Sequence, residues 1–389
     1  MTEHELGYDP FSWAVQDDPY PYYRRLRDEA PAYYVTERDL WVVSRWDDCM
    51  AVLTNPAQWS SARGNFFNDV PERIGKVMAT NDPPRHTLLR SLVEQVLSPE
   101  RVERLEPVIR AMARGLIGRC GDSGSVEFVG EFASSLTAGL MGYLFGVPQA
   151  DFPQLRGWLS AAVQTSESSG PAKPAPEFQL LFGYIARLVA ERRANPGDDM
   201  VSGLIAAEHD GYRLGDIEIV TEIGTLIAAA IQSLNMQLGN IALALALHPE
   251  QRAAVRANPA LIPAAIEEAV RWESALQGLL RSATSDAEIA GARIPAGAWL
   301  LVCFASANRD ERQFPEAERF LIDRRAQEHL GFSWGPHRCI GRPLGRLTLR
   351  VAFEELLPAL GDYQVDLARA ERTRNPNMRG FKTLPLRFG

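Results

Sequence analysis

A single cysteine in a glycine-flanked loop near the C-terminus most constrains what this chain can fold into and bind. The loop reads Phe332-Ser333-Trp334-Gly335-Pro336-His337-Arg338-Cys339-Ile340-Gly341, and an amphipathic segment follows from about 342 to 357. Glycine permits tight backbone turns, and the start of the next helix directs N–H groups and its positive dipole end at the sulfur. Such surroundings favour the thiolate, the form that binds metal. One cysteine cannot hold tetrahedral zinc or an iron–sulfur cluster, but it can be the single protein ligand of a haem iron.

Composition indicates an ordinary globular protein with an acidic balance. The chain has 389 residues, of which 46% are hydrophobic and 23% charged, and its net charge is −8. This charge, with no basic run, argues against nucleic-acid binding. The polar N-terminus is unlike a secretory signal, and we find no apolar run near the roughly 20 residues that cross a bilayer. The four cysteines show no paired spacing, as expected in a reducing compartment. We therefore expect a cytoplasmic protein that does not bind membranes.

The hydrophobic pattern predicts a mainly α protein with a small β-rich region. The segment 216–247 is apolar nearly all round, which predicts a buried central helix about 48 Å long. Further helices are expected near 84–97, 100–120, 127–146, 150–166, 176–195, 198–208 and 261–274, and strands near 32–35, 40–44, 279–283, 288–290 and 298–304. Pro171, Pro174 and Pro176 interrupt the helical pattern. No repeat or linker divides the chain, so we expect one domain over 1–389, with a loosely ordered segment at 1–17.

Two pairs of charged residues stand at helical spacing. Glu268 and Arg271 form E-x-x-R, which places both charges on one helix face. His86 and Arg90 lie four residues apart after Asp82-Pro83-Pro84, a good helix start. Each pair taken alone is more simply a solvated helix face, because exposed ion pairs are common and weak.

Taken in order, these motifs resemble the cytochrome P-450 family from about residue 18 to the end. The loop matches F-x-x-G-x-(H/R)-x-C-x-G at every fixed position, and D-P-P-x-H-x-x-x-R and E-x-x-R also match. The resemblance implies a single triangular, mostly helical domain that encloses haem b. The implied haem-binding residues are Phe332, Gly335 and Cys339, the axial iron ligand, with His86, Arg90, Arg281 and His337 as propionate partners. The implied structural cluster is Glu268, Arg271 and Arg319.

The central helix departs from the family pattern. Where the family usually shows A/G-G-x-D/E-T, this chain has Ala229-Ala230-Ile231-Gln232-Ser233. In the family the acid and alcohol help to deliver protons, so we take Gln232 and Ser233 as candidate catalytic residues. Ser233 keeps a hydroxyl, but Gln232 cannot titrate. Either proton delivery is weakened, or water takes the place of the acid. Ala275 stands where the family commonly has proline after E-x-x-R.

The resemblance implies a haem-thiolate monooxygenase that uses O2 and two electrons from a ferredoxin or flavodoxin with its reductase. The expected reaction is hydroxylation or O/N-dealkylation of a small or medium apolar or aromatic molecule. Gln232 keeps open oxidative ring coupling or peroxide-driven oxidation on the same scaffold, and a non-catalytic haem sensor is a third alternative. We expect a monomer of the kind found in bacterial secondary metabolism. Four arginines after the loop either form a docking patch for an acidic partner or only solvate the helix: Arg338, Arg342, Arg346 and Arg350.

The substrate pocket is expected from position in the family. Its apolar walls would be Phe66, Phe67, Ile227, Ala230, Leu234, Leu279, Leu280 and Phe381. Three amide side chains could orient the substrate: Asn65, Gln164 and Gln277. Each hydrophobic residue taken singly is more often core than contact.

Overall fold

The computed structural model describes residues 6–120, 124–155, 157–158, 176–324, 326 and 328–388. The helices are α1 (Trp13–Asp17), α2 (Tyr20–Glu29), α3 (Trp46–Thr54), α4 (Arg85–Val96), α5 (Pro99–Glu103), α6 (Glu106–Cys120), α7 (Ser134–Leu144), α9 (Pro176–Ala194), α10 (Met200–Ala206), α11 (Asp216–Leu247), α12 (Pro249–Ala257), α13 (Ile262–Trp272), α14 (Phe304–Ala307) and α15 (Arg342–Leu360). The strands are β1 (Ala32–Val35), β2 (Leu40–Val43), β3 (Trp59–Ser60), β4 (Ser125–Glu127), β5 (Leu279–Ala283), β6 (Ala287–Ile289), β7 (Ala292–Ile294), β8 (Trp299–Val302), β9 (Tyr363–Val365), β10 (Glu371–Arg372), β11 (Phe381–Thr383) and β12 (Pro385–Phe388).

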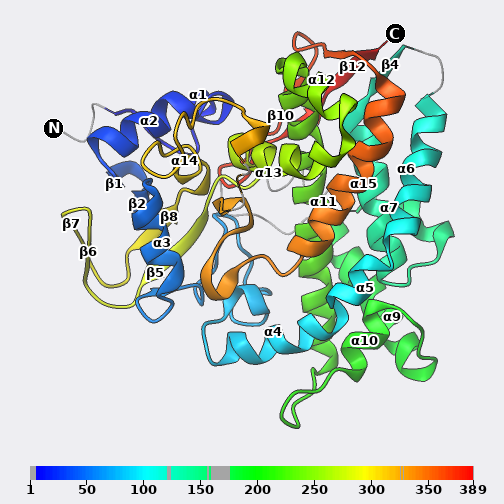
Figure 1. Ribbon diagram of the computed structural model, residues 1–389. Helices are drawn as coiled ribbons and strands as arrows, with labels where there is room; N and C mark the ends of the chain where they lie inside the picture. The colour runs from blue at the N-terminus through cyan, green and yellow to red at the C-terminus, as the bar shows by residue number, and fades with distance from the viewer. Residues whose placement is uncertain are drawn as a thin grey trace.

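The central helix α11 organises the helical part of the molecule. It packs against α7, α9, α13 and α15, and α6 lies beside α15 (Figure 1). Its buried residues cover most of its circumference, as the apolar pattern predicted. Contrary to our expectation from the sequence, α11 is long and apolar enough to cross a membrane by length and composition. In this fold it is instead the core helix around which the others pack.

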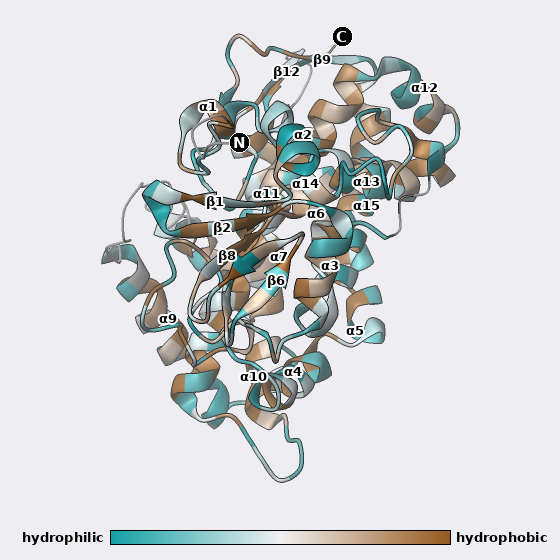
Figure 2. Ribbon diagram, turned by 90° about the vertical axis from the view of Figure 1, so that its left-hand side faces the viewer, coloured by the Kyte–Doolittle hydropathy of each residue, from teal (hydrophilic) through white to brown (hydrophobic). Residues whose placement is uncertain are grey.

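A five-stranded sheet forms the second part of the molecule, on the left in Figure 1. Its strand order is β1-β2-β8-β5-β3, with β2 and β8 parallel and the other pairs antiparallel. β2 and β8 are predominantly hydrophobic (Figure 2), and most of their side chains are buried. Every residue of β5 is buried, so the polar residues that this strand carries, including Arg281, are held inside the protein.

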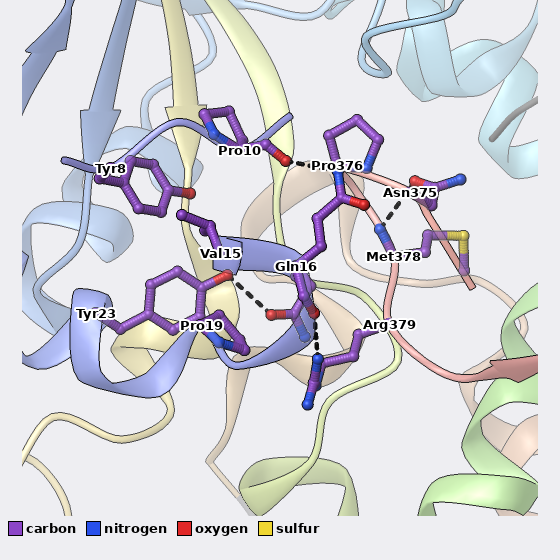
Figure 3. A pocket seen from close by; sticks show the side chains of 11 residues that line it. Tyr8, Pro10, Val15, Gln16, Pro19, Tyr23, Asn375, Pro376, Met378 and Arg379 are labelled. Carbon is purple, nitrogen blue, oxygen red and sulfur yellow. Dashed lines mark hydrogen bonds between the residues drawn. The ribbon is translucent and has the colours of Figure 1, made fainter. Parts of the chain in front are cut away.

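The described part of the N-terminal segment, residues 6–17, packs against the rest of the protein, unlike the loose segment expected at 1–17. Leu6, Tyr8 and Val15 are buried in a cluster with β2 and β8 residues. The carbonyl of Gln16 accepts a hydrogen bond from the Arg379 side chain, which ties α1 to the C-terminal loop beside a small pocket (Figure 3). Burial of these apolar side chains stabilises the position of residues 6–17. The sequence did not reveal this, because the few apolar residues are separated by polar ones and by Pro10.

Other differences from the expected elements involve short segments. The helix expected at 100–120 is two helices, α5 and α6, and the one expected at 127–146 begins as β4 and a π-helical turn (Phe128–Ala133). The sequence reading did not predict α3, α12 or the C-terminal strands β9 to β12. Most of the helix expected at 150–166 lies outside the described residues, as do Pro171 and Pro174.

Candidate active site

The cysteine loop is shaped by a close approach of its backbone to α3. It runs through two 3-10 turns, η7 (Leu330–Phe332) and η8 (Gly335–His337), into α15. Gly335 has φ +68°, and a β-carbon there would collide with the Leu53 carbonyl oxygen, so both conformation and space require glycine. The Cys339 N–H donates to the Phe332 carbonyl at 2.8 Å, which closes the loop on itself. The loop glycine that the sequence singled out therefore has a clear structural reason.

The Cys339 sulfur is accessible, although protein surrounds it on most sides. Its side chain is exposed, whereas Cys49 and Cys303 are buried thiols elsewhere. Burial raises the pKa of the Cys339 thiol, and the N–H groups of Gly341 and Arg342 and the charge of Arg90 act in the opposite direction. These are the backbone donors at the start of α15 that the sequence predicted around the sulfur. The enclosed but accessible sulfur is available as a metal ligand.

Basic side chains gather between α4, β5 and the loop, and the two histidines among them have unpaired nitrogens. The His86 and His337 rings are 4.2 Å apart, and among the described residues neither nitrogen of His86 nor Nε2 of His337 has a hydrogen-bond partner. Arg281 is buried, and the hydrogen-bond acceptor of its guanidinium among the described residues is the neighbouring Leu280 carbonyl, at 2.7 Å. Arg90 donates to the Pro336 and Arg338 carbonyls at 3.2 and 2.8 Å, which ties α4 to the loop.

Burial and the positive charges of the cluster lower the pKa values of its members, and the carboxylates of Asp82 and Glu94 offset this only in part. Burial and the charge of Arg90 lower the pKa of His86 to about 4. Burial and the charges of Arg281, His86 and Arg90 lower that of His337 to about 2. Burial also lowers the pKa of Arg281 to about 10. Buried donors without acceptors are unfavourable, so the cluster fits a ligand that supplies two carboxylates. A haem, with two propionates and an iron for the Cys339 thiolate, meets both requirements.

The middle of α11 faces an accessible space. Ala229 is exposed, most of its neighbours in the turns before and after it are partly accessible, and Ser233 is partly accessible on the same face. The Ser233 hydroxyl donates to the Ala229 carbonyl at 2.8 Å, four residues earlier. The loop adjoins this part of the helix, because a β-carbon at Gly345 would contact both Phe332 and Leu234. Gln232 lies next to Ser233 in an uninterrupted helix.

The Glu–Arg–Arg cluster forms, but with a different third member, so the assignment of Arg319 is wrong. Arg271 makes two hydrogen bonds to the fully buried Glu268 carboxylate, at 2.7 and 2.8 Å. The third cation is Arg324, whose Nε lies 3.2 Å from Glu268 Oε1. The Arg319 side chain is 64% exposed and pairs with Glu316 at 2.5 Å. Only its backbone carbonyl belongs to the cluster, as an acceptor for Arg271 at 3.0 Å.

The expected pocket residues are spread over several core clusters. Ile227, Leu234 and Phe381 are buried in the large helical core, and Ala230 packs against it. Leu279 belongs to the core cluster beside the sheet, and Leu280 to the core cluster that contains the N-terminal residues. Phe66 lies under the Arg73 guanidinium, and Phe67 packs edge-on against Phe11 at 4.9 Å.

Two of the expected orienting amides have other partners, and the third is not described. Gln277 accepts a hydrogen bond from Tyr23 at 2.8 Å, and Asn65 accepts one from Arg73 at 3.3 Å. Gln164 lies outside the described residues. Gln277 therefore holds Tyr23 of α2 in place, a role that was not expected from its sequence position.

Two of the four arginines after the loop are already paired with acids. Arg346 binds Glu267 at 2.5 and 2.8 Å, and Arg350 bonds to carboxylates of α6 and α15. The Arg338 guanidinium stacks on the Trp334 ring at 4.2 Å. In the part of the chain that the structure describes, no carboxylate forms an ion pair with Arg338 or Arg342. The possible docking patch is therefore reduced to these two.

Comparisons with known proteins agree with this architecture. The cytochrome P450 family model matches residues 175–387. The cytochrome P450 monooxygenase PikC of Streptomyces venezuelae is 34% identical, covering 95% of this chain and 91% of PikC. The structure of cytochrome P450 CYP109Q5 from Chondromyces apiculatus superposes with a TM-score of 0.91 at 32% identity, covering 98% of both chains. CYP109E1 from Bacillus megaterium, solved in complex with testosterone, gives a TM-score of 0.86 at 26% identity, covering 96% of this chain and 99% of its own.

Proposed function

Because the chain belongs to the cytochrome P450 family and is a cytochrome P450 monooxygenase, we propose that it holds haem b through the Cys339 thiolate and oxidises an apolar or aromatic molecule of small or medium size. The expected reaction is hydroxylation or O/N-dealkylation. We further propose that the whole chain acts as one domain in the cytoplasm. The bound testosterone of CYP109E1 supports a guest of this size and polarity.

The observation that carries the cofactor proposal is the group of buried, unpaired nitrogens at His86 and His337. When bound, haem supplies the oxygen-activating chemistry. The protein's part is to bind and orient it: His86, Arg90, Arg281 and His337 would hold the propionates. The N–H groups of Gly341 and Arg342 would stabilise the thiolate once the iron binds it, against the burial that raises the pKa of the free thiol.

Carbon monoxide difference spectroscopy tests this assignment. In the wild type we expect the Soret band that is characteristic of a haem-thiolate with bound carbon monoxide. In Cys339→Ser this band should be lost. A spectrum that Cys339→Ser leaves unchanged would refute the thiolate assignment. Cys49→Ser is a matched control, because that buried thiol donates to the Val43 carbonyl at 3.4 Å and the change should leave the band in place.

Electron delivery is proposed to come from a ferredoxin-type partner that meets Arg338 and Arg342. These two guanidiniums lie beside the cysteine loop and form no ion pair within the described residues, so they remain available to acids of a partner. Reduction rates with a ferredoxin should fall with rising salt. Arg338→Gln should slow reduction, while Arg114→Gln, an exposed arginine paired with Glu355, should not.

The helix α11 favours a second candidate reaction, oxidative ring coupling or peroxide-driven oxidation. Gln232 cannot release a proton, and the Ser233 hydroxyl donates its own to the Ala229 carbonyl. Proton delivery would then depend on water held near these groups. The test is product formed per reduced nicotinamide consumed, in the wild type and in Gln232→Glu. Higher coupling in the variant supports weakened proton delivery, and tight coupling in the wild type contradicts it.

A further inference from the structure

The central helix carries a buried carboxyl group for which the proposed reaction has no role. Glu222 is 3% exposed. Its Oε2 accepts a hydrogen bond from the Met78 N–H at 2.9 Å, while Oε1 has no partner among the described residues. Buried carboxylates are normally paired with a cation or fully hydrogen-bonded, because the cost of removing their charge from water is large. Glu222 is therefore half satisfied.

Among the residues that the structure describes, no cation pairs with the Glu222 carboxylate. Arg73 is the charged side chain that acts on Glu222, but its guanidinium binds the Asp69 carboxylate and donates to Asn65 at 3.3 Å. Burial raises the pKa of Glu222 to about 7, against the opposing effects of the Met78 N–H and Arg73. Oε1 of Glu222 therefore still needs a hydrogen-bond donor, and none of the described residues supplies one.

A second unpaired group lies one turn further along the same helix. The buried Thr225 hydroxyl also has no hydrogen-bond partner among the described residues. At 100° per residue, Glu222, Thr225, Ala229 and Ser233 fall within about 80° of one helix face. Ala229 on this face is exposed, so the stripe leads from the two unpaired groups to the accessible space beside the cysteine loop. The axial distance from Glu222 is about 10 Å to Ala229 and about 16 Å to Ser233.

We infer that Glu222 binds a basic amino group of the substrate, with Thr225 as a second acceptor, while the carbon to be oxidised lies about 10–16 Å along α11. An ammonium suits this place better than a hydroxyl. It satisfies the free oxygen and also compensates the buried charge, and hydrogen bonds between charged groups are the stronger ones. The inference rests on the proposed function, because it names the substrate class of that same site.

Binding of three matched probes tests the inference: dodecylamine, dodecanol and dodecanoate, whose chains span a comparable length. Dissociation constants are measured on haem-loaded protein by the low- to high-spin shift, and independently by equilibrium dialysis. In the wild type we expect dodecylamine to bind about tenfold or more tightly than dodecanol, and dodecanoate most weakly. Glu222→Gln should abolish the preference for the amine, and Thr225→Val should reduce it.

Two features keep the test interpretable. Gln at 222 retains an oxygen that can accept the Met78 N–H, so the variant removes charge more than structure. Glu208→Gln, which removes an exposed carboxylate paired with Arg213, is the control and should leave all three constants unchanged. Thr225→Val provides a second variant if Glu222→Gln fails to fold.

The outcomes separate this inference from the proposed function. Equal binding of the three probes, or an amine preference that survives in Glu222→Gln, would overturn the inference. So would an amine that ligates the iron and produces no high-spin shift. The carbon monoxide band, measured on the same samples, reports independently on the haem-thiolate. If the band is present and the preference absent, only the inference fails, whereas absence of the band contradicts the proposed function.

Discussion

Arg324, and not the expected Arg319, contacts Glu268 in the buried charge cluster. This difference gives a quantitative prediction about stability. Arg324→Ala removes the cation 3.2 Å from Glu268 Oε1 and two donors to the backbone of the preceding segment, at Pro315 and Glu316. Arg319→Ala removes only an exposed pair with Glu316. The two changes delete the same side-chain type five residues apart, so each is a control for the other.

The expected magnitudes follow from burial. A hydrogen bond to a charged partner contributes about 1.5–3 kcal/mol, and each carbonyl bond adds about 1 kcal/mol or less, so Arg324→Ala should cost roughly 3 kcal/mol. An exposed pair such as Arg319–Glu316 is worth about 0.5 kcal/mol. With about 2.1 cal/mol/K per residue, 389 residues give an unfolding entropy of roughly 0.8 kcal/mol/K. The melting temperature should therefore fall by about 4 °C for Arg324→Ala and less than about 1 °C for Arg319→Ala.

Circular dichroism melts at saturating haem measure this difference, because a fixed excess of cofactor keeps its contribution the same in all samples. Glu268→Gln should cost more than either arginine variant, since it leaves Arg271 as a buried cation without its counter-ion. Equal shifts for Arg324→Ala and Arg319→Ala, or a larger one for Arg319→Ala, would refute the reasoning.

Two further variants probe buried polar groups. Ala275→Pro removes the N–H that donates to Gln237 Oε1 at 3.0 Å. We expect the free energy of unfolding, measured by chemical denaturation, to fall by about 1–3 kcal/mol. The fall should be smaller in a Gln237→Leu background, where the hydrogen bond is already absent. The pKa of Glu222 rises from 4.5 to about 7 on folding, so the folded chain holds the extra proton between these values and its stability falls as pH rises through them. Glu222→Gln should therefore be about 3 kcal/mol more stable than wild type at pH 8, with no gain at pH 4; an unchanged difference across this range would contradict the shift.

Sequence reasoning succeeded where the determinants are local. The loop around Cys339 could be anticipated because its glycines, its sulfur and the start of α15 are adjacent in the chain. The long apolar pattern of α11 was equally direct, since it repeats over many turns. Short elements such as α3 and β4 were missed, because few residues specify them and their neighbours in space decide their conformation.

Residues that meet across long stretches of chain could not be assigned in the same way. Arg319 and Arg324 have identical side chains, and only the path of the segment between them determines which one reaches Glu268. Glu222 gave a weak signal, a carboxylate in a mostly apolar helix, but the partner of its one bonded oxygen, the Met78 N–H, is 144 residues away in the chain. The two amides Gln277 and Asn65 likewise found partners that spacing alone does not reveal.

The unpaired nitrogens of His86 and His337 also bear on how much working enzyme a cell contains. A ligand that binds only the native chain stabilises it in proportion to the logarithm of the free ligand concentration. Here the ligand would be haem, whose propionates would supply partners for these buried nitrogens. Newly made chains in porphyrin-starved cells should thus be degraded faster than chains made when tetrapyrrole synthesis keeps pace. Abundance, as well as catalysis, would then follow iron and porphyrin supply.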